Sequence, residues 1–182
     1  MTIQKVIGIV GLPGSGKSTA LEFVKEIAPI ITMGDVVRDE VIRRGLEITP
    51  VTLGEISKQI RLESGSQIVA KKCIEEIKRI NETTVFIDGI RSMDEVLLFK
   101  EYWNFQIIAV ICDEDVRYKR LSDRGRSDDT LIFDDILERD RREVNFGLTE
   151  VIGHADYKVQ NNSDTKSLKK NIREVIENIL RE

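Results

Sequence analysis

The segment that most constrains the fold of this chain is IVGLPGSGKSTALEF, which spans residues 9–23. Gly11, Gly16, Lys17 and Ser18 match the spacing G-x-x-x-x-G-K-[ST], after a strand-like apolar run and at the start of a helical one. Glycines at these positions let successive backbone N–H groups curl around one anion, and the helix N-terminus adds partial positive charge. The segment is therefore expected to bind the phosphates of a nucleotide.

The same motif predicts the roles of single residues. Lys17 is expected to reach the β- and γ-phosphates, and the Ser18 hydroxyl is expected to ligate Mg²⁺. Asp88 ends the apolar run TVFID and is a candidate second ligand, although an ordinary Asp-Gly turn would look the same. The predicted cofactor is Mg²⁺ with ATP, and the predicted nucleotide-binding residues are Gly11, Gly14, Ser15, Gly16, Lys17, Ser18 and Thr19.

Apolar runs alternate with helical stretches along the rest of the chain. Five runs are strand-like, at residues 6–10, 29–32, 84–88, 105–112 and 157–160. The run FQIIAVIC is continuous, which is typical of a strand buried on both faces of a parallel sheet. Repeated strand–helix alternation predicts a three-layer α/β/α fold around a five-stranded parallel sheet, in a single domain over residues 1–182.

Helical periodicity predicts the connections between these strands. Helices are expected at 16–27, at 35–44, twice between Leu53 and Ile80, near 93–97, at 114–124, at 133–146 and around 168–179. The helices within 45–80 exceed what a minimal crossover needs, so we expect them to form a small inserted subdomain. The polar stretch DRGRSDDT at 123–130 is expected to be a loop.

Composition limits the class of protein. The 182 residues include 28 Lys and Arg against 32 Asp and Glu, a net charge of −4 that argues against a general nucleic-acid binder. We expect no membrane span, because no apolar run approaches the ~18 residues that one needs. The start shows no signal-peptide pattern, and Cys73 and Cys112 are expected to be buried thiols. The expected location is the cytoplasm, and the sequence does not predict the oligomeric state.

A candidate acceptor site lies in ITMGDVVRDE, which follows the second strand-like run. Asp35 near a helix start is explained by the favourable helix dipole, and Asp35 with Arg38 by an i,i+3 surface ion pair. The alternative is that both residues hold the polar part of a second substrate.

Two segments of the chain, one after the second strand-like run and one at the end of the third, resemble the adenylate kinase-related branch of P-loop nucleoside monophosphate kinases. That family has TGD-x-x-R after strand two and DG-x-P-R at the end of strand three. This chain has TMGDVVR at 32–38 and DGIR at 88–91, without the proline. The resemblance implies that Arg38 and Arg91 grip the acceptor phosphate, within a substrate site of Thr32, Gly34, Asp35, Arg38, Gly89 and Arg91.

A third match concerns arginines after the fourth strand. The family has two arginines at i and i+4 on a helix, then one in a polar loop and another in the next helix. The resemblance therefore implies catalytic roles for Arg120, Arg124, Arg126 and Arg139, although Arg141 and Arg142 are adjacent and a solvated charged face would look similar. It also implies that residues 125–132 form a lid and that residues 45–80 clamp the acceptor.

The end of the chain, HADYKVQNNSD, is more similar to the AD-x-V-I-x-N ending of dephospho-coenzyme A kinases. Asn161 and Asn162 would then border the adenine of ATP, but a polar turn is the favoured interpretation. His154, the single histidine, is expected to pack or cap rather than to act as a base.

The combined interpretation is Mg²⁺-dependent transfer of the ATP γ-phosphoryl group to a small phosphorylated acceptor, a nucleoside monophosphate above others. Two alternatives stay open: an ATPase or nucleotide switch acting on a protein or RNA partner, and a dephospho-coenzyme A kinase-like activity. The stretch 46–80, where acceptor identity would be read, matches neither family closely.

Overall fold

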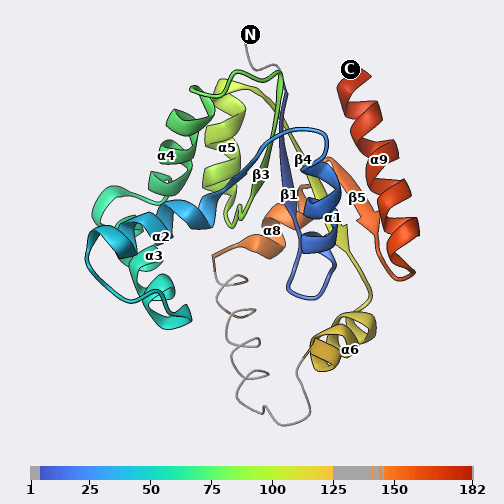
Figure 1. The fold of residues 1–182 in the computed structure, drawn as a ribbon, viewed down its shortest axis with the longest axis horizontal. Coiled ribbons are helices and arrows are strands. Elements are labelled where there is room, and N and C mark those ends of the chain that lie inside the picture. Colours follow the sequence, from blue (N-terminus) through green and yellow to red (C-terminus); the bar gives the residue numbers. More distant parts are fainter. Residues whose placement is uncertain (1–4, 125–140, 142–143, 145, 182) are drawn as a thin grey trace.

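The computed structural model describes residues 5–124, 141, 144 and 146–181. In this part of the chain the strands form one parallel sheet in the order β2-β3-β1-β4-β5 (Figure 1). The strands are β1 (Lys5–Val10), β2 (Ile30–Thr32), β3 (Thr84–Asp88), β4 (Asn104–Ile111) and β5 (Tyr157–Gln160). Each lies within one residue of its predicted bounds, so the predicted five-stranded parallel sheet is confirmed.

Alternating side chains of the central strands bury both faces of the sheet. Val6 and Val10 of β1 pack into one core, whereas Ile7 and Ile9 pack into the other. All four are at most 1% exposed. A strand buried in this way needs helices over both of its faces, as the continuous apolar runs predicted.

Helices form the two outer layers. On one face α1 and α9 pack against the sheet, and on the other α2, α4, α5 and α8 do so (Figure 1). The helices are α1 (Lys17–Val24), α2 (Met33–Arg43), α3 (Pro50–Ser64), α4 (Ile68–Ile77), α5 (Met93–Tyr102), α6 (Glu114–Arg124), α8 (Leu148–Gly153) and α9 (Thr165–Arg181). The three-layer α/β/α architecture is therefore confirmed.

Three helices differ from the sequence-based expectation, and the first is α1, which ends at Val24 rather than at Ile27. Helix α2 begins at Met33, directly after the last residue of β2, rather than at Asp35. Asp35 therefore lies in its first turn, where a carboxylate favours the helix dipole. Helix α8 was not predicted, because six residues give too little periodicity to detect.

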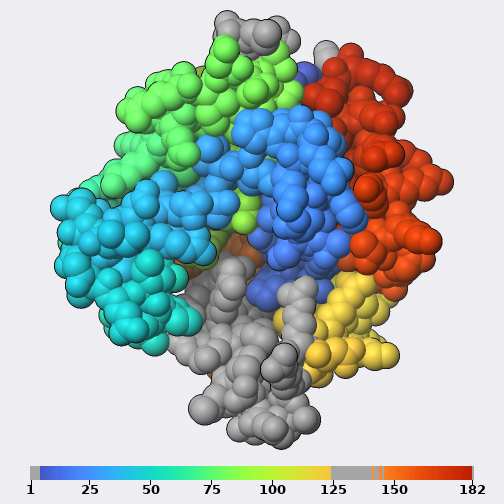
Figure 2. Space-filling view, in the orientation of Figure 1, coloured from blue at the N-terminus to red at the C-terminus, as the bar shows by residue number. Residues whose placement is uncertain are grey.

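Local signals explain the start of α3. Thr49 caps the helix, since its hydroxyl accepts the Thr52 N–H at 3.1 Å while its own N–H donates to the Thr52 hydroxyl at 2.9 Å. Pro50 occupies the first helical position, where its missing N–H costs nothing. With α2, this helix forms a lobe on the side of the molecule opposite α9 (Figure 2).

A buried carboxylate joins the helices of this lobe. Glu40 of α2 is 5% exposed, and it accepts hydrogen bonds from Arg43 Nε at 2.8 Å and Arg44 Nε at 2.6 Å. Arg44 also reaches Glu63 of α3 at 3.1 Å. The hydrogen bonds from Arg43 and then Arg44 lower the pKa of Glu40 to about 2.

The two thiols differ in burial. Cys73 is completely buried in α4, and burial raises its pKa to about 12. Cys112 is only half-buried, because β4 ends at Ile111 and leaves it in the following loop. The prediction of two buried thiols is thus right for Cys73 and wrong for Cys112. Among the described residues, no helix combines the length and apolar character needed to cross a membrane.

Candidate functional site

The phosphate-binding loop connects β1 to α1 in a conformation that requires glycine. Gly14 and Gly16 have φ values of 83° and 98°, in the left-handed region that other residues avoid. A Cβ atom on Gly16 would lie 2.1 Å from Asn161 Nδ2, and one on Gly11 would lie 2.5 Å from Ser15 Oγ. The motif therefore adopts the strand–loop–helix geometry that its spacing predicts.

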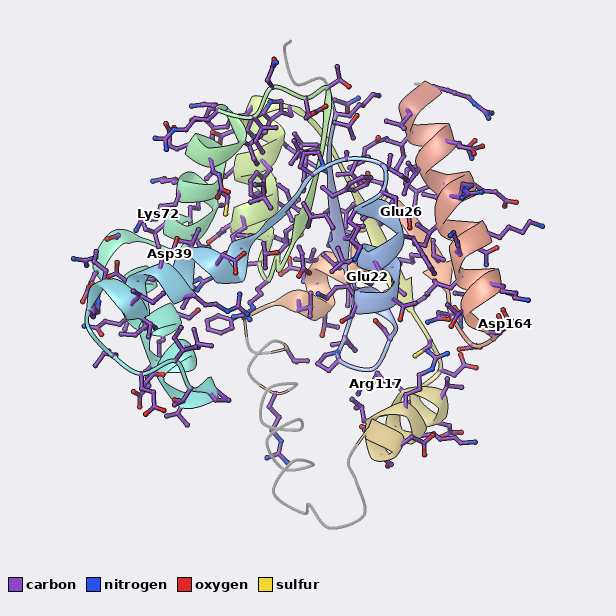
Figure 3. The ribbon with its side chains drawn as sticks, viewed as in Figure 1. Glu22, Glu26, Asp39, Lys72, Arg117 and Asp164 are labelled. Carbon is purple, nitrogen blue, oxygen red and sulfur yellow. The ribbon has the colours of Figure 1, made fainter. Side chains whose placement is uncertain are left out.

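Two side chains outside the motif support this loop. Arg117 of α6 donates from Nη1 to the Pro13 carbonyl at 3.1 Å, and Figure 3 shows it between α6 and the loop. Asn161, which follows β5, donates from Nδ2 to the Ser15 carbonyl at 2.7 Å. These two hydrogen bonds tie the carbonyl groups of Pro13 and Ser15 to α6 and to the segment after β5, and so fix the conformation of the loop.

Neither support was predicted from the sequence. Asn161 is 4% exposed and binds the Ser15 carbonyl, so this residue has a packing role that the favoured interpretation of a polar turn did not include. That interpretation fits Asn162, an exposed residue that accepts the Asp113 N–H at 2.8 Å. His154 lies at the C-terminus of α8 with its Nδ1 3.0 Å from the Glu150 carbonyl, which agrees with the expected capping role. No spacing signal marks Arg117.

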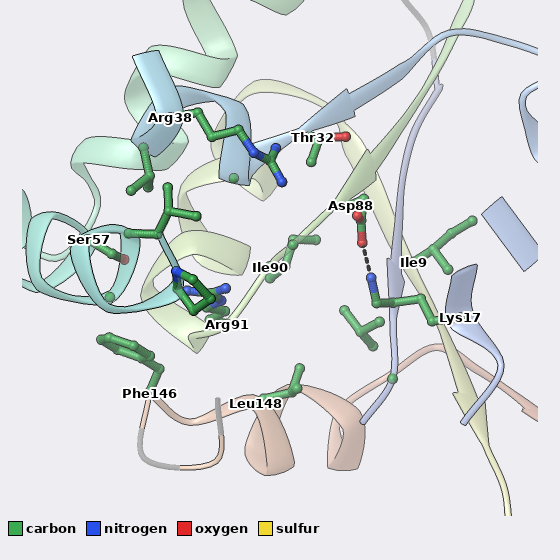
Figure 4. A pocket seen from close by; sticks show the side chains of 18 residues that line it. Ile9, Lys17, Thr32, Arg38, Ser57, Asp88, Ile90, Arg91, Phe146 and Leu148 are labelled. Carbon is green, nitrogen blue, oxygen red and sulfur yellow. Dashed lines mark hydrogen bonds and ion pairs between the residues drawn. The ribbon is translucent and has the colours of Figure 1, made fainter. Parts of the chain in front are cut away.

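Lys17 and Asp88 form an ion pair at the carboxyl edge of the sheet (Figure 4). The β1–β3 register places Asp88 opposite Ile9, two residues before the loop begins at Gly11. Their side chains are 23% and 17% exposed, so the pair is largely shielded from water. The structure therefore brings together the two residues that the sequence predicted from separate segments.

The surroundings of this pair suit Mg²⁺. Ser18 is exposed in the first turn of α1, and Thr19 beside it is half-buried. Among the described residues, no group of three or more His, Cys, Asp and Glu could hold a metal ion. Mg²⁺ is commonly held by one or two protein ligands plus substrate phosphates and water, and the Ser18 hydroxyl and the Asp88 carboxylate are oxygen donors of the kind it prefers.

A cavity of about 280 Å³ extends from the phosphate-binding loop to α2 and α3. In Figure 4, Lys17 and Asp88 lie on one side of it, and Ser57 and Phe146 lie on the other. Five of the six predicted substrate residues line it, namely Thr32, Gly34, Arg38, Gly89 and Arg91. Its apolar wall consists of Ile9, Val10, Val37, Pro50, Leu53, Ile90, Phe146 and Leu148.

Asp35, the sixth predicted substrate residue, does not line this cavity. Its carboxylate forms an ion pair with Arg38 one turn further along α2. Both side chains are about half exposed. The two interpretations of this segment, a surface ion pair and an acceptor site, are thus compatible. Asp35 orients the guanidinium of Arg38, and Arg38 itself lines the cavity.

The predicted lid falls mostly outside the described residues. Arg120 lies on α6, where its Nη2 donates to the Ser163 carbonyl at 3.3 Å, and Arg124 is the last residue of that helix. The residues outside the described part include Arg126, Arg139, Arg142 and all of 125–132. Arg141 is exposed. The roles of these arginines stay predictions from the sequence.

Comparison with known proteins identifies relatives along the whole chain. Residues 7–145 match the family model described as an AAA domain. A UPF0200 protein of Thermococcus onnurineus is 39% identical over 183 residues, which cover 97% of this chain and 99% of the relative. A UPF0200/UPF0201 protein of Archaeoglobus fulgidus is 41% identical over 95% of this chain, which spans 55% of that relative's length.

Solved structures share the fold at low sequence identity. TT1252 from Thermus thermophilus is 20% identical with a TM-score of 0.61, over 97% of this chain and 98% of its own. A shikimate kinase from Acinetobacter baumannii, in complex with shikimate, is 13% identical with a TM-score of 0.55, over 99% of this chain and 94% of its own. With the sheet order and the phosphate-binding loop, these findings show that the chain belongs to the UPF0200 family and, over residues 7–145, to the AAA domain family, and that it has a P-loop kinase fold.

Proposed function

We propose that this protein is a nucleotide kinase that transfers the γ-phosphoryl group of ATP to a nucleoside monophosphate. The observation that supports this proposal is that one cavity is lined by Lys17, Asp88, Arg38 and Arg91 together. Two arginines beside a phosphate-binding loop suit a substrate that carries a phosphate of its own. An enzyme that only hydrolyses ATP has no second phosphate for both arginines to bind, since its acceptor is water.

In this proposal the reaction is an in-line transfer. A phosphate oxygen of the acceptor attacks the γ-phosphorus, and the bond to the β–γ bridging oxygen breaks as ADP leaves with its electron pair. Lys17 neutralises charge on the β- and γ-phosphates, while Arg38 and Arg91 hold the acceptor phosphate in line. The apolar wall around Leu53, Ile90 and Leu148 keeps water from competing with the acceptor.

Bound Mg²⁺ would supply further charge neutralisation at the phosphates, held by Ser18 and Asp88. Lys17 would then exchange its ion pair with Asp88 for contacts with phosphate oxygens. The assignment of 45–80 as the acceptor clamp and 125–132 as the lid belongs to the same proposal, which treats the chain as one kinase domain.

A substrate panel tests the proposal directly. AMP, CMP, UMP, GMP and dephospho-coenzyme A would each be incubated with Mg²⁺ and ATP, and the products identified by mass. We expect at least one nucleoside monophosphate to become a diphosphate as ADP forms. Phosphate release that is independent of every acceptor would instead favour an ATPase or switch, and phosphorylation of dephospho-coenzyme A alone would reassign the acceptor.

Arginine variants give a second test of the same site. Arg38→Ala and Arg91→Ala are each expected to lower kcat/KM for the acceptor by about 10- to 150-fold, because each removes a charge-assisted bond worth roughly 1.5–3 kcal/mol. The KM for ATP should stay within about twofold. Arg173→Ala, on the exposed side of α9, is the matched control and should behave as wild type. Unchanged acceptor kinetics in both cavity variants would contradict the proposed acceptor site.

A further inference from the structure

One charged cluster beside the cavity has no role in the mechanism above. Glu95 lies in the first turn of α5, and its side chain is 0% exposed. Its Oε1 accepts a hydrogen bond from Arg61 Nη2 at 2.9 Å, and its Oε2 accepts the Arg91 backbone N–H at 2.9 Å. This carboxylate therefore joins helix α3 to the loop that carries Arg91.

Arg61 extends the cluster to the wall of the cavity. Its Nη1 donates to the Ser57 carbonyl at 2.9 Å and to the Ser57 hydroxyl at 2.5 Å. Its guanidinium also stands 5.2 Å from the centre of the Phe146 ring, which lies 5.8 Å from the Arg91 guanidinium. Ser57, Phe146 and Arg91 all line the cavity, so Arg61, whose side chain is 13% exposed, contacts the first two directly and is linked to the third through Glu95.

Stability alone is a weak explanation for this arrangement. A buried ion pair often stabilises a fold no better than apolar residues of the same size, because removing both charges from water is costly. What an ion pair provides is a fixed geometry, since each charge is satisfied only by partners at set distances and angles. Here those partners are parts of α3, of α5 and of the Arg91 loop.

We propose that Glu95 and Arg61 are positioning residues, which set Arg91 and Phe146 for binding of the acceptor. This inference rests on the proposed function, because it takes Arg91 to bind the acceptor phosphate. A misplaced Arg91 loop weakens the grip on the acceptor, whereas the phosphate-binding loop, on the far side of the cavity, is left intact.

Steady-state kinetics with Glu95→Gln test the proposal against Asp94→Asn. Asp94 is the neighbouring carboxylate, but it is exposed and binds Ser66 at 2.7 Å, away from the cavity. With AMP, CMP, UMP and GMP as probes, we expect Glu95→Gln to raise the acceptor KM roughly tenfold, with the KM for ATP within about twofold. Asp94→Asn should match wild type. A parallel rise in both KM values would show a merely structural role and overturn the proposal.

Arg61 variants guard against loss of folding in Glu95→Gln. Arg61→Lys keeps the charge but not the planar fork that binds Glu95 and Ser57 together, so it should raise the acceptor KM less than Arg61→Met does. In the double variant Glu95→Gln/Arg61→Met the two effects should not add, because both remove the same interaction. Full additivity would mean that the residues act separately.

A measurement without any acceptor separates this inference from the proposed function. Hydrogen exchange of the Arg91 amide, followed by NMR, should be roughly tenfold faster in Glu95→Gln and faster in Arg61→Met, but unchanged in Asp94→Asn. Should these exchange changes appear while the wild type phosphorylates no nucleoside monophosphate, the proposed function fails and the positioning pair stands. If every variant shows normal turnover, an unchanged acceptor KM and unchanged exchange of the Arg91 amide, the positioning role of Glu95 and Arg61 is overturned and the proposed function stands.

Discussion

Lys17 shows how a local motif and a distant residue combine in one site. Its position follows from the glycine spacing alone, but its ion pair with Asp88 depends on the pairing of β1 with β3. The ammonium group is therefore held at the sheet edge by the carboxylate that ends β3. In the proposed function this same carboxylate is a Mg²⁺ ligand, so ATP with its metal ion would bind both members of the pair.

Replacing Lys17 with alanine should lower the turnover number by at least about 10²- to 10³-fold, because the variant loses a preorganised positive charge that faces the transferring phosphate. The measurement is ADP formation at saturating ATP and acceptor, with circular dichroism to confirm folding. Lys25→Ala, which alters an exposed lysine just after α1, serves as the control. Activity of Lys17→Ala within about twofold of wild type would mean that the site is misplaced.

Asn161 should matter through the phosphate-binding loop. Asn161→Ala leaves the buried Ser15 carbonyl without its donor, at a cost of about 1–3 kcal/mol. We expect weaker ATP binding in calorimetry and a lower free energy of unfolding. Asn162→Ala is the matched control, since that neighbouring side chain is exposed. Equal ATP affinity in the two variants would argue against a support role for Asn161.

Residues of the motif could be predicted because their geometry is local. Gly16, Lys17 and Ser18 are neighbours in the sequence, and the glycine itself indicates a backbone conformation in the left-handed region. Glu95 and Arg61 could not be predicted, because their bond joins positions separated by 34 residues. Nothing in the spacing of either residue distinguishes it from the many charged residues on the surface.

At the scale of elements, the lobe of α2 and α3 depends on the charges around Glu40. Its two arginine partners lie on α2 and at the end of that helix, and one of them continues to α3. Periodicity predicted these helices, since their apolar positions recur at helical spacing. It could not predict that Glu40 is buried, because a charged residue on a helix is usually assigned to the solvent face.

Acid should weaken the lobe through Glu40. Its pKa is about 2 in the folded chain against an ordinary value of 4.5, so its stabilising effect is present above pH 4.5 and is lost as the pH falls towards 2. We expect the free energy of unfolding of wild type to exceed that of Glu40→Gln near pH 6, and the difference to shrink between pH 4.5 and 2. Urea unfolding at several pH values measures it, and a constant difference would contradict the assignment.

Over the whole molecule, the two cores have different sequence signals. The helical side of the core under α1 and α9 could be predicted, because the apolar residues of α9 recur at helical spacing. The strand side could not, because continuous apolar runs do not reveal which residues face which layer of helices. The order of the strands could not, because β2-β3-β1-β4-β5 is set by pairing between distant segments. Helix α8 packs against the core on the opposite face of the sheet, beside the cavity. It was not predicted, because it is too short to show helical periodicity.

Phe86 tests the core beneath α1 and α9. It is 0% exposed at the centre of β3, so Phe86→Ala should lower the free energy of unfolding by about 3–5 kcal/mol through lost burial and a residual cavity. Leu97→Ala provides the comparison, because Leu97 is 55% exposed on α5 and should change stability by less than ~1 kcal/mol. Similar losses in the two variants, measured by urea unfolding, would contradict the described burial.

The central place of β1 has a consequence for synthesis of the chain on the ribosome. β1 is made first, yet Lys5 pairs with Thr84 and Asn104, which emerge much later. At about 5–20 residues per second, the nascent VIGIV segment waits several seconds before both of its edges are covered. Chains released before β4 is complete would leave a bare apolar edge open to association with one another. The edges of β1 are therefore covered only once β4 has been made, so the order of synthesis leaves the central strand of the sheet unpaired for longest.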